Sequence, residues 1–122
     1  MLINANASEV VAAFTTQVKW ATADQIPTAP GNGAYQFASN GGIALTWLAG
    51  QNAVAYDVYR LIADQDQQFQ LLITVKGTSY VDNSPEARQN VQSTKGITYA
   101  IFSVGPTGIE NPGGIVIPLN IL

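Results

Sequence analysis

Beyond residue 33, short runs of aliphatic, aromatic and β-branched residues alternate with turn-forming residues. The turns are rich in Gly, Asn, Pro and Asp, as in Asn40-Gly41-Gly42 and in residues 105–114. Because turns recur so often, long helices have no room, and the pattern is typical of an all-β domain. We expect strands at residues 34–38, 43–47, 54–62, 69–75, 79–81, 97–104 and 115–122.

Alternation within these runs predicts which side chains face inward. Residues 43–47 read Ile-Ala-Leu-Thr-Trp, so that every second side chain points to the same face. Pro118 cannot donate a ladder hydrogen bond, so the last strand should lie at a sheet edge or have a bulge there. Six side chains are expected to meet in one dry core between two sheets: Leu45, Trp47, Tyr56, Val58, Tyr99 and Ile101.

The composition limits what the domain can do. The chain has 122 residues, which suits one domain, and only 11% are charged. The net charge is −3, and the five basic residues are scattered, which argues against nucleic-acid binding and docking on anionic lipid. Without Cys or His, thiol and Ser-His-Asp catalysis and thiolate or imidazole metal sites are excluded. We therefore expect no enzyme, no cofactor and no membrane insertion.

Two weaker patterns have both a functional and a structural interpretation. Asp64-Gln65-Asp66 clusters oxygen ligands as a Ca²⁺ loop would, but it lacks the glycine and the bidentate glutamate, and a solvated hairpin loop is the better interpretation. Tyr35, Phe37, Tyr59 and Tyr80 could form an aromatic platform for sugars. Ordinary packing of outward-pointing rings in alternating strands is the simpler explanation.

Six motifs in a fixed order resemble the fibronectin type III family. They are Pro27-Thr28-Ala29-Pro30, Ile43-Ala44-Leu45-Thr46-Trp47, Tyr56-Asp57-Val58-Tyr59-Arg60, Ser79-Tyr80-Val81-Asp82, Tyr99-Ala100-Ile101-Phe102-Ser103-Val104 and Gly108-Ile109-Glu110-Asn111-Pro112. The resemblance covers residues 27–122. It implies a seven-stranded antiparallel fibronectin type III/immunoglobulin-like sandwich with an N-terminal extension.

The resemblance also implies a role for Tyr99 and marks two departures. Tyr99 would be the tyrosine-corner residue, with its hydroxyl bonded to the backbone a few residues upstream. The connection over residues 82–95 is longer and more polar than the family pattern, and residues 1–26 are outside it. Family members that bind integrins use an Arg-Gly-Asp loop, which this chain lacks. Whatever is particular to this protein should lie in these two departures.

Residues 1–26 are interpreted as an anchoring or oligomerisation arm attached to the domain. Val11, Phe14 and Val18 have helical spacing after the candidate cap Ser8, whereas the alternation of residues 14–20 favours a strand. In either form Val11, Phe14, Val18 and Trp20 are too apolar to stay in water. They should cover the domain's own sheet or bind a neighbouring subunit.

These features lead to a non-enzymatic structural or interaction module. The first hypothesis is a bacteriophage virion protein, a capsid-decorating or fibre/tail accessory subunit, with capsid or tail subunits or other copies of itself as protein partners. We expect a homo-oligomer or part of a larger assembly. No secretion signal is recognisable, since the start has neither a basic region nor an uninterrupted apolar run. The alternative is a carbohydrate-associated or adhesion module of a bacterial cell surface or secreted system, with a surface glycan as partner.

Overall fold

The computed structural model describes residues 26–63, 65–92 and 96–119. Its elements in chain order are β2 (Gly31–Phe37), β3 (Ile43–Leu48), β4 (Ala55–Ile62), β5 (Gln70–Val75), β6 (Ser79–Asp82), α2 (Pro85–Gln92), β7 (Ile97–Val104) and β8 (Ile115–Pro118). Each strand lies within or close to a run whose alternation predicted it. The arm residues Val11, Phe14, Val18 and Trp20 lie outside the described residues, so their form and their contacts stay predictions.

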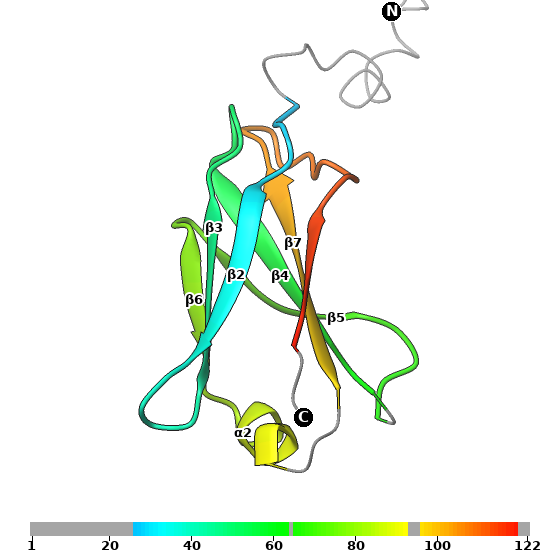
Figure 1. The fold of residues 1–122 in the computed structure, drawn as a ribbon. Helices are drawn as coiled ribbons and strands as arrows, with labels where there is room; N and C mark the ends of the chain where they lie inside the picture. The colour runs from blue at the N-terminus through cyan, green and yellow to red at the C-terminus, as the bar shows by residue number, and fades with distance from the viewer. Residues whose placement is uncertain (1–25, 64, 93–95, 120–122) are drawn as a thin grey trace, which may run out of the picture.

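The seven strands of the described residues form two antiparallel sheets packed face to face (Figure 1). One sheet has the order β2-β3-β6 and the other the order β5-β4-β7-β8. Neighbouring strands in each sheet are antiparallel throughout. The predicted all-β sandwich is therefore confirmed.

The core lies between the two sheets, where the sequence pattern placed it. Leu45 and Trp47 of β3 are 0% and 3% exposed, and Tyr56 and Val58 of β4 are 2% and 0% exposed. The rings of Trp47 and Tyr56 meet edge to face, with centroids 5.6 Å apart. All six predicted core residues belong to this one buried cluster. Each fully buried aliphatic side chain stabilises the fold by roughly 1.5–3 kcal/mol.

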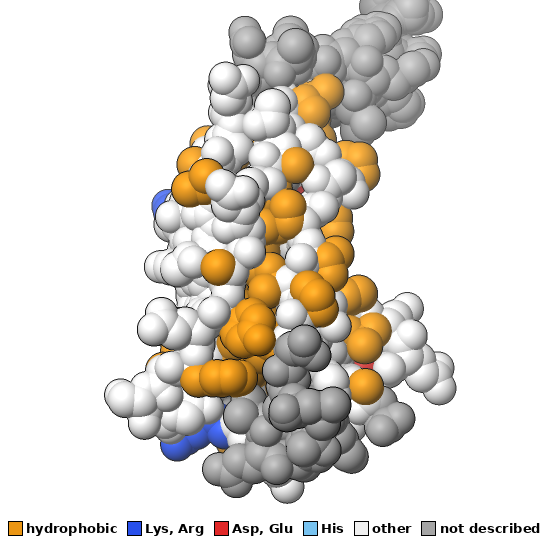
Figure 2. Space-filling view, in the orientation of Figure 1, with side chains coloured by type: hydrophobic (Ala, Val, Ile, Leu, Met, Phe, Trp, Pro, Cys, Tyr) orange, Lys and Arg blue, Asp and Glu red, His pale blue; other side chains and the backbone are white. Residues whose placement is uncertain are grey.

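The two sheets also meet along one side, where edge strands β2 and β8 lie next to each other (Figure 1). Hydrophobic side chains gather along this line in Figure 2. Tyr35 of β2 and Ile115 of β8 pack against the core there. Pro118 ends β8 at the sheet edge, as its missing N–H requires.

One prediction for the connection after β6 needs correction. The connection over residues 82–95 was expected only to be long and polar, without a helix, but much of its described part is helix α2. Ser84 caps this helix, because its Oγ accepts a hydrogen bond from the backbone N–H of Ala87 at 3.2 Å. Pro85 follows in the first helical position, where its missing N–H costs nothing. No helix in the described part of the chain is long and apolar enough to cross a membrane.

Candidate functional site

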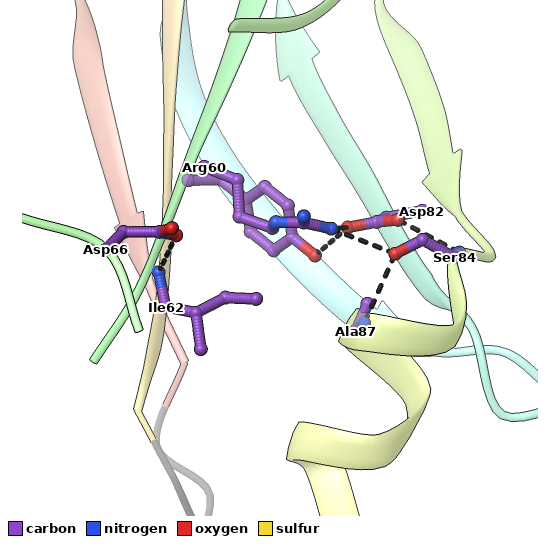
Figure 3. A network of polar contacts seen from close by, with 7 residues as sticks. Arg60, Ile62, Asp66, Asp82, Ser84 and Ala87 are labelled. Carbon is purple, nitrogen blue, oxygen red and sulfur yellow. Dashed lines mark hydrogen bonds and ion pairs between the residues drawn. The ribbon is translucent and has the colours of Figure 1, made fainter. Parts of the chain in front are cut away.

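A buried polar network ties the two sheets to helix α2 at one end of the sandwich (Figure 3). Nη1 of Arg60, on β4, donates hydrogen bonds of 2.9 Å to Oδ2 of Asp82 and to Oγ of Ser84. The side chains of Arg60 and Asp82 are 12% and 2% exposed. The backbone N–H of Ser84 donates to Oδ1 of Asp82 at 3.1 Å. A pair this deeply buried is held in one geometry and has no access to a substrate.

Tyr99 also belongs to this network, and the predicted backbone partner of its hydroxyl is wrong. Its hydroxyl donates to Oδ2 of Asp82 at 2.6 Å, and therefore to a side chain rather than to the backbone. Burial, followed by the hydrogen bond to Asp82, raises the pKa of Tyr99. The ring is 0% exposed, so the hydroxyl needs a partner, and an ionised carboxylate is a strong one.

The protonation state of Asp82 follows from its donors. Burial raises the pKa of Asp82, but the hydrogen bonds from Tyr99, Ser84 and Arg60 outweigh burial and hold this pKa below its ordinary value. Asp82 is therefore ionised at neutral pH. The Nε of Arg60 is buried and makes no hydrogen bond. We interpret the network as a structural clamp between β4, β6, β7 and α2.

The hairpin after β4 contains the candidate Ca²⁺ loop, and its described acidic residue has a structural role. Oδ2 of Asp66 accepts a hydrogen bond from the backbone N–H of Ile62 at 2.9 Å, which closes the turn (Figure 3). Asp64 lies outside the described residues. No cluster of three acidic residues that could hold a metal ion exists in the described part of the chain.

The four aromatic residues considered as a sugar platform do not share one surface. Tyr35 and Tyr80 both align with Leu45 in the three-stranded sheet and pack against the core. Phe37 contacts Tyr35 edge to face at 5.6 Å. Tyr59 aligns with Ala100 on the outside of the other sheet. A platform made of all four rings is therefore wrong, and Tyr59 is the ring that belongs to a different surface.

That surface is the outward side of the four-stranded sheet, called the outer face below. The strand registers assign to it Leu71 and Thr74 of β5, Ala55, Asp57, Tyr59 and Leu61 of β4, Thr98, Ala100, Phe102 and Val104 of β7, and Val116 and Pro118 of β8. An antiparallel sheet with one face on the core normally presents polar residues on the other. Here most of the second face is apolar as well. None of these residues is Lys or Arg.

The centre of the outer face is one apolar row across all four strands. Leu71, Tyr59, Ala100 and Val116 lie side by side in register. Leu71 and Val116 are 55% and 60% exposed, whereas Ala100 between them is 4% exposed. The Tyr59 ring packs edge to face against Phe102 at 5.3 Å. Exposed apolar side chains on one face of a sheet make that face a candidate contact surface.

Gly114 allows the chain before β8 to pass close to β7 and to the Phe102 ring. A Cβ atom at Gly114 would lie 2.6 Å from the backbone oxygen of Ile101 and 2.7 Å from the Phe102 ring. Both distances are too short for any side chain. The chain entering β8 therefore passes close over β7 and supports the Phe102 ring on the outer face.

An acidic pair lies beside this row, next to Tyr59. Oε2 of Glu110 accepts a hydrogen bond of 3.0 Å from the Tyr59 hydroxyl, and Oδ1 of Asp57 accepts one of 2.5 Å from Thr74. Burial and the adjacent Asp57 carboxyl raise the pKa of Glu110, while the Tyr59 bond opposes them. Burial and the bond to Glu110 raise the pKa of Tyr59 to about 12. The outer face thus combines apolar area with a negatively charged edge, and the described residues enclose no pocket.

A scan against protein-family models and a search of curated proteins find no match for the chain. Solved structures do match it. An Fn3-like protein from Clostridium thermocellum is 21% identical, with a TM-score of 0.57 over 75% of this chain and 91% of that chain. FN3tt mut is 16% identical, with a TM-score of 0.59 over 79% and 97%. The protein has a fibronectin type III-like fold.

A third match is to part of a larger protein. Endo-D from Streptococcus pneumoniae R6, a glycoside hydrolase structure, is 17% identical, with a TM-score of 0.54 over 79% of this chain and 15% of that chain. At these identities the comparisons show the fold. Fibronectin type III-like domains generally act as interaction modules, and they also occur in carbohydrate-active proteins.

Proposed function

We propose that this protein is a non-catalytic interaction module that joins a larger protein assembly through its N-terminal arm, residues 1–26. The observation behind the proposal is the outer face, because its apolar row and acidic edge form a surface built for contact. The buried network of Arg60 and Asp82 supports it as well, since a clamped sandwich suits a rigid subunit.

Within this proposal, the first hypothesis for the assembly is a bacteriophage particle, in which the arm binds a capsid or tail subunit or another copy of the chain. It rests on the layout of the sequence, an apolar arm followed by a weakly charged domain. No comparison points to a virion.

Native mass determination tests the arm. We compare the full chain with variants in which Phe14 or Trp20 is replaced by Ser, and with Thr15→Ser as a matched control in the same segment. The proposal expects an oligomer, or association with a particle, for the full chain and for the control, and weaker association for the two apolar replacements. A full chain that stays monomeric at all concentrations and binds no particle contradicts it.

The alternative is a carbohydrate-associated or adhesion module, and the match to Endo-D favours it. Tyr59 and Phe102 are the rings on the outer face that a sugar could reach, and Tyr59 has the Glu110 carboxylate beside it. Glycan-array binding that is lost in Tyr59→Ala and kept in Tyr80→Phe would support this function. An array with no signal for the unaltered protein excludes it.

A further inference from the structure

The outer face lacks a cover within the described residues, although its composition resembles that of a buried surface. Leu71 and Val116 are more than half exposed at opposite edges of the sheet, with Tyr59 and Ala100 between them. An isolated exposed aliphatic residue is normal, but an apolar row across a whole sheet indicates a partner.

We propose that the outer face is the docking site of the chain's own N-terminal segment, residues 8–21. This inference deepens the proposed function, on which it rests for the binding role of the arm, by naming the surface that the arm occupies. Three observations select this occupant over other partners: the point where the chain enters the domain, the size of the segment and its charge.

The chain enters the domain at the acidic end of the outer face. The Nδ2 of Asn111 donates a 2.6 Å hydrogen bond to the backbone oxygen of Pro27, which holds the start of the domain against the loop between β7 and β8. The preceding residue of that loop, Glu110, is the partner of Tyr59 on the outer face. The segment before Ile26 therefore starts next to the surface that lacks a cover.

The segment also has the reach and the dimensions for this surface. Residues 21–25 can bridge up to about 17 Å when extended. From Val11 to Ala21 a helix would be about 15 Å long, and residues 14–20 as a strand would span about 20 Å. Four strands are about 14 Å across. We place the docked segment as a strand over residues 14–20, because this form puts Phe14, Val18 and Trp20 on one side, facing the row.

The charges match in position as well as in sign. Lys19 is the basic residue of the segment, and it lies seven residues before Ile26, at the end that returns to the domain. Asp57 and Glu110 lie at that same end of the outer face. Docking places Lys19 beside this carboxyl pair, and Phe14 and Val11 further along the apolar row.

A short tether favours docking within one chain, because the effective concentration of the segment is then on the order of millimolar. The same contacts form between two copies when the segments are exchanged, which is a low-cost route to an oligomer. Exchange therefore connects this docking site with assembly through the arm.

The test uses the full chain and the fluorescence of Trp20. Trp47 is buried and contributes a constant signal, which a Trp20→Phe variant measures separately. We expect Trp20 to be protected from acrylamide quenching, and the double variant Leu71→Asp/Val116→Asp to lose this protection. Leu48→Asp is the control, because Leu48 is 57% exposed on the other sheet and should leave Trp20 protected.

Zero-length carbodiimide cross-linking then identifies the contact. We expect a bond between Lys19 and Glu110 or Asp57, within one chain for a monomer and between chains for an exchanged oligomer. A Trp20 that is fully quenched in the unaltered chain overturns the docking site, and so does protection that survives the double variant. If either result for Trp20 is found but the protein still assembles, the proposed function stands and only the docking site on the outer face is refuted.

Discussion

Replacing Asp82 by Asn should cause one of the largest losses of stability in the domain. The Asp82 side chain is 2% exposed and receives hydrogen bonds from Arg60, Tyr99 and the backbone of Ser84. Asn is close in shape but neutral, and its amide group presents donors where only acceptors fit. Arg60 keeps its charge and remains 12% exposed, without a counter-ion.

The magnitude follows from the cost of an unpaired buried charge. Removing one partner of a buried ion pair costs about 3–5 kcal/mol in unfolding free energy. For a domain of this size, 1 kcal/mol corresponds to roughly 4–8 °C in Tm, so the loss should be at least about 12 °C. Arg60→Met should also destabilise, but the double variant should lose much less than the sum, with a coupling of about 2–3 kcal/mol.

Urea unfolding of the four proteins measures this cycle. Acid titration gives a second signature, since the pKa of Asp82 is lowered in the fold. The unfolded chain takes up the proton first, so this contribution is complete above about pH 5 and is lost as the pH falls toward the folded pKa. Asp82→Asn should lack that part of the acid sensitivity. A coupling below about 0.5 kcal/mol, as for exposed pairs, would refute the reasoning.

Three further tests follow from the described contacts. Tyr99→Phe removes a hydrogen bond to a carboxylate and should lower the unfolding free energy by about 1.5–3 kcal/mol. Tyr56→Phe removes only the acceptor of the Gly50 N–H and should lower it by about 1 kcal/mol. Urea unfolding measures both losses. Ser84→Ala removes the cap of α2 and a partner of Arg60; we expect a loss of at least about 1 kcal/mol and a weaker helical circular dichroism signal, and unchanged stability would contradict the capping role. Gly114→Ala should cost about 1–3 kcal/mol by overpacking against Phe102, while Gly77→Ala, with open space around its Cβ position, should have little effect on the thermal midpoint.

Local pattern was sufficient to predict the strands and the core. The period-2 alternation of residues 43–47 and the turn residues around them depend only on neighbours in sequence, and β3 and its buried Leu45 and Trp47 lie where they were predicted. Helix α2 was missed although a local signal was present: Ser84-Pro85-Glu86 combines a cap, a first-turn proline and an acidic residue. The polarity of the segment masked that signal.

The clamp could not be found by local reasoning. Asp82 and Tyr99 are 17 residues apart, and Arg60 is 22 residues before Asp82. They meet only because β4, β6 and β7 converge at one end of the sandwich. In sequence, Asp82 resembles any turn aspartate, and the family pattern suggested a backbone partner for Tyr99. In the folded domain Asp82 is buried, and its Oδ2 accepts the hydrogen bonds of both Arg60 and Tyr99.

The outer face, in contrast, has a signal in the sequence whose meaning depends on the fold. Residues 97–104 read Ile-Thr-Tyr-Ala-Ile-Phe-Ser-Val, a nearly continuous apolar run that is typical of a strand buried on both sides. In this sandwich, the second sheet covers only the side of β7 that bears Ile101; Phe102 faces outward. The remaining apolar side of β7 therefore has no explanation within the described domain. The proposed docking of the arm would account for it, which is why the arm and the outer face are best tested together.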